Sequence, residues 1–174
     1  MNTIAESPTA ALNRVTLTPS LEHLAFEVGV PGDWQKLPLP EEAVDFEKPT
    51  TFLPLGVFMA SYGAVIFAVA ARPVYGEGTV SQWLSYLARE MAFSVEDSEP
   101  VSFGPLRGFQ CSATQAAEMG RMRLRAVLVE DGGRMISLTL MAPEAIWPSM
   151  ADTLDAMLQS FRLLDQRGPT VAVL

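Results

Sequence analysis

The run Phe52-Leu-Pro-Leu-Gly-Val-Phe-Met-Ala-Ser-Tyr-Gly-Ala-Val-Ile-Phe-Ala-Val-Ala-Ala71 is the most apolar part of the chain. No charged side chain occurs between Lys48 and Arg72. Such a run has two interpretations, a buried β-hairpin or a membrane-spanning helix, since about 20 apolar residues cross a bilayer core. Pro54 and Gly56 interrupt a helix early, so we predict the hairpin.

The predicted hairpin has strands at about residues 55–60 and 64–71, with a turn at Ser61-Tyr-Gly63 between them. Both segments are rich in β-branched and aromatic residues, which favour strands. Neither alternates cleanly between apolar and polar residues, which is typical of a strand covered on both faces. A helix inserted in a membrane would leave the neighbouring amphipathic elements without a shared core.

Length and composition indicate one soluble globular domain. The chain has 174 residues, of which 49% are hydrophobic and 18% are charged, so a sizeable core is expected. We assign residues 1–20 to an N-terminal arm, residues 21–164 to a single α+β domain and residues 165–174 to a C-terminal tail.

The charge balance argues against two classes of partner. The net charge is −8, which repels the phosphate backbone of nucleic acids and anionic lipid surfaces. We therefore expect no nucleic-acid partner and no membrane insertion. Cys111 is the single cysteine and cannot form an internal disulfide, and the N-terminus lacks the pattern of a secretory signal. These features favour the cytoplasm.

Strand and turn patterns recur through the chain. Residues 24–30 alternate in polarity and end at Pro31-Gly-Asp-Trp34, and residues 109–114 predict a second half-buried strand. A hairpin is predicted for residues 122–141, turning at Asp131-Gly132 or Gly132-Gly133. Residues 93–100 are polar and acidic and are assigned to no strand. Residues 101–103 are a candidate short strand, and Gly104-Pro-Leu-Arg-Gly108 predicts a turn.

Two helices are predicted. Thr79 and Gln82 have the spacing of a capping box, and an apolar stripe follows through Met91. The second helix starts near Pro148, whose missing N–H suits a first helical turn, and its stripe ends at Phe161. With about six strands in three antiparallel pairs, the fold class is α+β with an antiparallel sheet.

The order of these elements resembles the PsbP-like superfamily. The resemblance rests on Pro31-Gly-Asp-Trp34 after a strand, an Arg-Pro loop at Arg72, a tryptophan-containing helix, and the terminal Leu158-Gln-Ser-Phe-Arg162. The superfamily includes the photosystem II protein PsbP, the Ran-binding Mog protein of yeast and small bacterial proteins, among them Eag-type chaperones for secreted effectors. It implies about six strands with helices on both faces of the sheet.

The resemblance also implies a function. The bacterial branch is the closest fit, and its common activity is binding other proteins. PsbP-type metal contacts use histidine and acidic residues, and His23 is the only histidine of this chain, so that role does not carry over.

One charged constellation stands out. Arg121, Arg123 and Arg125 alternate along a predicted strand, so they share one face and could hold a carboxylate or an acidic segment of a partner. The alternative is that they cover an open sheet face and pair with helix acids such as Asp152 and Asp155. Methionine-rich surface beside Trp83 or Trp147 would add an adaptable apolar contact.

No catalytic or metal site is predicted, and no cofactor is implied. His23 cannot form a histidine pair for zinc, and Cys111 lies on the apolar face of its strand, as a buried inert thiol does. The sequence Gly76-Glu-Gly78 lacks the lysine of a phosphate-binding loop.

These observations lead to two principal hypotheses. The first is a non-enzymatic chaperone or adaptor that binds another protein, for which a secreted effector is one candidate, and that forms a homodimer. The second is a domain that binds a small carboxylate or other anion, or acts as an enzyme, through a pocket on the sheet. The second hypothesis requires a partly polar cavity at the arginines. A membrane contact by residues 52–71 is the third alternative.

Overall fold

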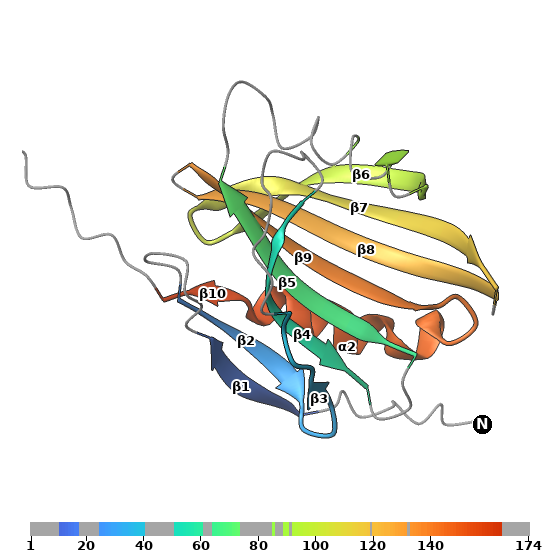
Figure 1. The fold of residues 1–174 in the computed structure, drawn as a ribbon, viewed down its shortest axis with the longest axis horizontal. Coiled ribbons are helices and arrows are strands. Elements are labelled where there is room, and N and C mark those ends of the chain that lie inside the picture. The colour runs from blue at the N-terminus through green and yellow to red at the C-terminus, as the bar shows by residue number, and fades with distance from the viewer. Residues whose placement is uncertain are drawn as a thin grey trace, which may run out of the picture.

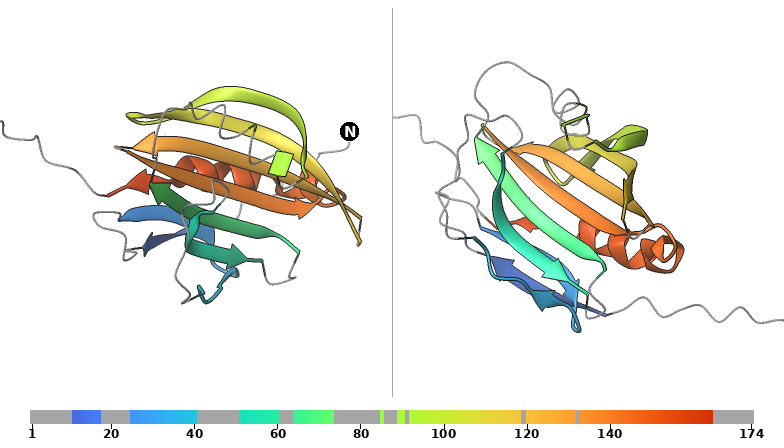
Figure 2. Two further views of the ribbon diagram at one scale, coloured as in Figure 1. Left: turned by 45° about the horizontal axis from the view of Figure 1, so that its top comes forward. Right: turned by 45° about the vertical axis from the view of Figure 1, so that its right-hand side comes forward.

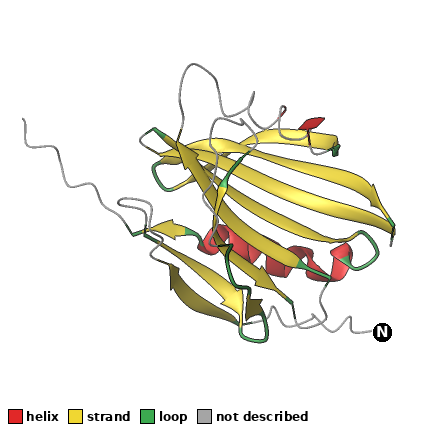
Figure 3. Ribbon diagram, viewed as in Figure 1, coloured by secondary structure: helices red, strands yellow, loops and turns green. Residues whose placement is uncertain are grey.

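The computed structural model describes residues 11–17, 25–40, 51–60, 64–73, 85, 89–90, 92–118, 120–131 and 133–164, and strands form most of this part (Figure 3). A seven-stranded antiparallel sheet has the order β3-β4-β5-β9-β8-β7-β6 (Figure 1). Its strands are β3 (Gln35–Lys36), β4 (Leu53–Met59), β5 (Ile66–Pro73), β6 (Ser94–Phe103), β7 (Leu106–Ala117), β8 (Gly120–Asp131) and β9 (Arg134–Pro143). A three-stranded sheet, β1-β2-β10, contains β1 (Leu12–Leu17), β2 (Phe26–Pro31) and β10 (Arg162–Leu163). One helix, α2 (Trp147–Ser160), joins β9 to β10.

The predicted apolar hairpin is confirmed as β4 and β5. The two strands pair in antiparallel register from Leu53 opposite Ala71 to Met59 opposite Ile66, with an irregularity between Pro54 and Gly56. β5 also pairs with β9, so it lies inside the sheet and its backbone is bonded on both sides. The predicted turn at residues 61–63 lies outside the described residues. Across the residues that the structure describes, no helix has the length and hydropathy that a bilayer crossing requires.

The hairpin predicted for residues 122–141 is confirmed as β8 and β9. Asp131 pairs with Arg134, so the turn lies between these two residues, and Gly133 within it has a φ of 86°. A positive φ costs glycine little because it has no Cβ. Val127 faces the same side as Leu138, as the alternation predicted.

The larger core of the described residues lies between the two sheets and the helix. α2 and the three-stranded sheet cover one face of the seven-stranded sheet, as the two views of Figure 2 show. Phe26 and Val28 of β2, Phe67 of β5 and Leu138 of β9 are all 0% exposed in this core. Burial on this scale is the main favourable term in folding.

The helix forms as its sequence predicts. Pro148 lies in its first turn, where a missing N–H costs little. Leu154, Met157 and Leu158 are buried, and Phe161, directly after the helix, packs 5.7 Å from the ring of Phe26. The side chain of Ser160 accepts a 2.7 Å hydrogen bond from the N–H of Gly29, which ties the end of α2 to β2.

The number and extent of the strands differ from the prediction. The described residues form ten strands, where about six were predicted. Three of the ten, β1, β3 and β10, have short or weakly alternating sequences that give little strand signal. Residues 93–100 were assigned to no strand and residues 101–103 to a short one, but Ser94–Phe103 is a ten-residue strand at the sheet edge. An exposed edge strand needs no apolar alternation, and that is why the pattern missed it. Residues 12–17 of the predicted arm form β1 and pair with β2.

Helices on both faces of the sheet are not confirmed. Within the described residues, α2 is the one helix that the structure delimits, and it lies on one face. The helix predicted from Thr79 to Met91 falls mostly on residues outside the described ranges. The opposite face of the sheet carries a second, smaller buried cluster of Cys111, Leu128 and Met135.

Candidate functional site

A groove of about 920 Å³ lies between the β6–β7 turn and the C-terminal half of α2. Residues 101–106 form one wall, and residues 158–159 and 161–163 form the other. Gln110 and Arg125 reach it from the central strands β7 and β8. The groove therefore opens between the end of β6 and β10, which is an edge strand of the three-stranded sheet.

The walls of the groove contain a connected apolar surface. The rings of Phe103 and Phe161 meet edge to face, with their centroids 6.5 Å apart. Leu106 and Leu158 are buried beside them, and Leu163 is partly buried. Aromatic pairs of this kind form well-defined contact surfaces for a ligand.

The charged side chains of the groove are engaged within the protein. Arg125 forms an ion pair with Asp155 of α2, and Asp131 forms one with Arg134 at 2.7 Å. Arg162 donates hydrogen bonds to the carbonyl oxygens of Gln159 and Phe161, at 2.6 and 2.7 Å. Carbonyl groups at a helix end attract cations, so Arg162 stabilises the C-terminus of α2. The four charges that line the groove, two positive and two negative, sum to zero.

Arg121, Arg123 and Arg125, the arginine row, lie on β8 and face α2, as their alternation predicted. They share this face with Val127, which pairs with core residue Leu138. Their exposure falls along the strand, since the side chains of Arg121 and Arg125 are 60% and 24% exposed. The row therefore runs from solvent toward the groove.

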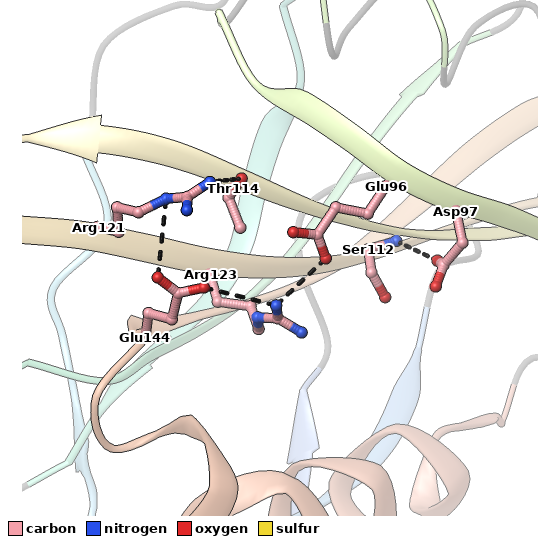
Figure 4. Close-up of polar contacts among 7 residues, drawn as sticks. All are labelled: Glu96, Asp97, Ser112, Thr114, Arg121, Arg123 and Glu144. Carbon is pink, nitrogen blue, oxygen red and sulfur yellow. Dashed lines mark hydrogen bonds and ion pairs between the residues drawn. The ribbon is translucent and has the colours of Figure 1, made fainter.

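The two outer arginines belong to an ion-pair network (Figure 4). The Glu144 carboxylate lies 3.7 Å from Arg121 and 3.6 Å from Arg123. Glu96 of β6 approaches Arg123 to 3.2 Å. The guanidinium of Arg121 also donates to the hydroxyl of Thr114, at 3.1 Å.

An irregularity in β6 directs its acidic side chains. The register between β6 and β7 shifts between Val95 and Asp97, which places Glu96 at the irregular position. The Asp97 carboxylate accepts a 3.0 Å hydrogen bond from the backbone N–H of Ser112 (Figure 4). A bulge of this kind re-aims side chains at a sheet edge, and here it turns Glu96 toward Arg123.

The alternative interpretation, that the arginines pair with acidic residues of the helix, is confirmed in part. Arg125 does pair with a helix acid, Asp155, but Glu144 and Glu96 replace Asp152 as the partners of the other two. Local pattern could not identify these partners, because Glu96 lies in a polar stretch that was assigned to no strand and Glu144 lies between β9 and α2.

The structure brings together only part of the predicted binding set. Arg125 lies over the ring of Trp147 at 5.9 Å, which is a cation–π geometry. Trp147 is 7% exposed, so its ring belongs to the core. Arg125 is the member of the arginine row that lines the groove. Trp83 lies outside the described residues, and so does His23.

Sequence reasoning missed the groove residues themselves. Phe103 was assigned to a short strand and Phe161 to the apolar stripe of the helix, and neither was proposed as a site. The turn at Gly104-Pro105 was recognised, but its approach to α2 depends on residues more than 50 positions away. The space between them is a tertiary feature that leaves no local signal.

Two features bear on the chemistry of the described residues, their acidic and thiol groups and the burial of Cys111. No group of three or more His, Cys, Asp or Glu side chains that could hold a metal ion occurs among them. Cys111 is 2% exposed, and burial raises the pKa of its thiol, so the nucleophilic thiolate is disfavoured. What the groove offers chemically is an apolar surface with hydrogen-bonding groups at its rim.

No protein-family model and no curated protein matches the sequence. Solved structures do match. Cyanobacterial PsbP (CyanoP) from Synechocystis is 13% identical with a TM-score of 0.62, and the match covers 94% of this chain and 98% of that one. LpqN of Mycobacterium tuberculosis, described as involved in cell envelope biogenesis, is 12% identical with a TM-score of 0.58, covering 87% and 91%.

A further match is a Bacteroides thetaiotaomicron structure, 12% identical with a TM-score of 0.53, which covers 89% of this chain and 48% of that one. None of the three is described as an enzyme. At these identities the matches establish the arrangement of the elements and not an activity. The fold of this protein is PsbP-like, as the resemblance in its sequence implied.

Proposed function

We propose that this protein is a non-enzymatic binding protein that holds a segment of another polypeptide in the groove between the β6–β7 turn and α2. The single observation that carries the proposal is the groove, at about 920 Å³ with an apolar aromatic surface. That volume lies in the upper part of the range of about 300–1,000 Å³ that ligand sites occupy.

A polypeptide suits the groove better than a small charged molecule does. The charges at the groove have partners within the protein, so a ligand gains more from apolar contact and backbone hydrogen bonds than from charge. The groove also lies beside β10, which is an edge strand of the three-stranded sheet. Sheet edges bind extended peptides through main-chain hydrogen bonds, with pockets for alternate side chains.

A substitution that fills the groove tests this proposal. Gln159 is exposed on α2 and lines the groove, so Gln159→Trp would occupy it without disturbing the core. We expect peptides selected from a random library on the natural chain to lose at least about tenfold in affinity for the variant, because each loses part of its apolar contact.

The matched control is Asp152→Trp, which places the same side chain on an exposed position of α2 outside the groove. Affinity should be unchanged in this control. The proposal fails if no library peptide binds, or if both variants bind the selected peptides as well as the natural chain does.

The second candidate is a carboxylate-binding site at Arg125. It is favoured by the position of this guanidinium in the groove. A carboxylate ligand would compete with Asp155, so Asp155→Asn should increase its affinity and Arg125→Gln should abolish it. A thermal-shift assay with a panel of small carboxylates tests this site in the natural chain and in both variants. If no carboxylate stabilises any of the three chains, the carboxylate-binding proposal fails.

The wider proposal retains a chaperone or adaptor role, a homodimer and the cytoplasm. Its support is the PsbP-like fold together with the high apolar content of the chain. Light scattering of the purified protein tests the homodimer. A monomeric mass at all accessible concentrations would refute the homodimer.

A further inference from the structure

The strand β1 is an end strand of the three-stranded sheet, and no described strand lies beyond it (Figure 1). Its six residues pair with β2 in one continuous register, without an irregularity. The strand contains no proline, and Arg14 is its one charged residue. Prolines, bulges and several charges are features by which edge strands avoid pairing with other chains. The edge strand β6 has all of these features, whereas β1 has a single charge.

The hydrogen bonds of β2 show which way the backbone groups of β1 point. The N–H of Leu164 donates to the carbonyl oxygen of Ala25 at 2.9 Å, so Ala25 is bonded on the β10 side of β2. The N–H of Gly29 points to the same side, where it donates to the hydroxyl of Ser160 at 2.7 Å. Because backbone groups alternate along a strand, the even-numbered residues of β2 are the ones that bond to β1.

Two exposed residues of β1 therefore have backbone groups that point outward. The partners of the even-numbered β2 residues are Asn13, Val15 and Leu17. The N–H and C=O groups of Arg14 and Thr16 point away from β2, because they alternate with these three. Among the described residues, no backbone hydrogen bond joins Arg14 or Thr16 to a segment beyond β1. Both residues are exposed, so an incoming strand can reach these groups.

A second copy of β1 is complementary to this edge. When a two-fold axis perpendicular to the sheet relates two antiparallel copies, residues that share a face pair with each other. With Val15 opposite Val15 of the second copy, Arg14 lies opposite Thr16. The outward N–H and C=O groups of both residues then form hydrogen bonds across the axis.

The charges near the edge favour this register. Arg14 forms an ion pair of 3.1 Å with Glu27 of its own chain. Glu27 also pairs with Thr16, so Glu27 of the second copy lies in the same row as Arg14. A register centred on Arg14 would place two like charges opposite each other, which is unfavourable. A register centred on Asn13 would leave the outward groups of Thr16 without a partner.

We propose that β1 pairs in antiparallel register with β1 of a second copy, with Val15 at the two-fold axis. This interface rests on the homodimer retained in the proposed function and does not depend on the groove. The groove lies beside β10, at the other end of the three-stranded sheet, so the pairing leaves β10 of each copy unoccupied. The contact is short, and we expect a dimer that dissociates on dilution.

A proline at position 16 tests the pairing. The N–H of Thr16 points outward, so Thr16→Pro removes a donor from the interface and none from the ladder with β2. Because both copies lose this donor, we expect the dissociation constant of the dimer to rise at least about tenfold. Sedimentation equilibrium over a range of protein concentrations measures it.

Two controls accompany this variant. Thr16→Val keeps the backbone donor and a strand-forming side chain, so its dissociation constant should equal that of the natural chain. The amide of Gly29 is bonded to Ser160 inside each copy. Its hydrogen exchange should be equal in all three chains, which would show that β2 remains in place.

A disulfide tests the register and does not depend on the folding of the proline variant. In a Cys111→Ala background, Val15→Cys places two thiols opposite each other at the axis. Cα atoms at such a position are about 4.5 Å apart, within the range that a disulfide spans. We expect a covalent dimer with oxidised glutathione. Asn13→Cys is the control, because it is more exposed but lies opposite Leu17 of the second copy and should form no covalent dimer.

The outcomes separate the interface from the proposed function. A monomeric natural chain at every accessible concentration would overturn the homodimer and this interface, and would leave peptide binding in the groove untouched. A natural dimer that is equally stable in Thr16→Pro would overturn the interface and keep the homodimer. Equal cross-linking of Val15→Cys and Asn13→Cys would contradict the proposed register.

Discussion

At the scale of single residues, Gly108 of β7 lies in a position that has no space for a Cβ atom. A Cβ at this position would lie 1.9 Å from the carbonyl oxygen of Leu128 and 2.9 Å from the Cα of Val129. Both are backbone atoms of the neighbouring strand β8, so they cannot move without separating the strands. Glycine is therefore required at Gly108 by its surroundings and not by its own backbone conformation.

We expect Gly108→Ala to lower the free energy of unfolding by about 3 kcal/mol, since overpacking forces the backbone apart. Gly104→Ala is the comparison, because Gly104 has a φ of +58° but open space around its Cβ position. It should cost about 1 kcal/mol through the left-handed conformation alone. Urea denaturation measures both, and equal losses would contradict this account.

Cys111 gives a prediction about pH. Burial raises the pKa of its thiol, so the folded chain holds this proton more tightly than the unfolded chain does. The thiol's contribution to stability is complete below the unfolded pKa and is lost as the pH rises through the folded pKa.

The stability of the natural chain should therefore fall more steeply than that of Cys111→Ala between about pH 8 and about pH 10. Below that range the two should differ by a constant amount, which reflects the packing of the side chain. Urea denaturation across the pH series provides the measurement. If the two curves of stability against pH stay parallel over the whole series, ionisation of the thiol does not contribute to the pH dependence.

At the scale of elements, β6 shows how this fold protects a sheet edge. It carries three acids, an irregularity near Val95 and Pro100, all of which discourage pairing with another chain. These features also make its sequence resemble a loop, because they remove the alternation of apolar and polar residues by which a strand is recognised.

Removing these features should promote association. We expect Glu99→Val with Pro100→Val to form assemblies larger than those of the natural chain, because the edge regains an apolar side chain and a backbone donor. Light scattering coupled to size exclusion measures this. Glu118→Val, at an exposed turn, is the control. Identical masses for all three chains would argue against β6 as a protected edge.

Elements with a strong apolar pattern were the ones that sequence reasoning predicted best. The hairpins β4–β5 and β8–β9 and the helix α2 combine strong composition with strong periodicity or a clear turn, so their types were correct. β3 and β10 contain two residues each and exist only because other strands pair with them. No local pattern specifies such elements, and β1 was read as part of an arm for a similar reason.

At the scale of the whole molecule, the arrangement of two sheets around one helix creates the candidate site. The arginine row was predictable because alternation fixes which residues share a face. Its partners were only partly predictable, since Glu96 and Glu144 approach β8 from β6 and from the end of β9. The groove was not predictable, because its walls come from segments that meet only after both sheets have formed.

The most direct test of the groove as the binding site is a map of backbone amide chemical shifts, recorded as a library-selected peptide is titrated into the natural chain. We expect the largest changes at Ser102, Gly104, Gln110 and Leu163, which line the groove on three different elements and the turn between β6 and β7. Changes confined to β1 or β3, on the far side of the molecule from β6, would contradict the account.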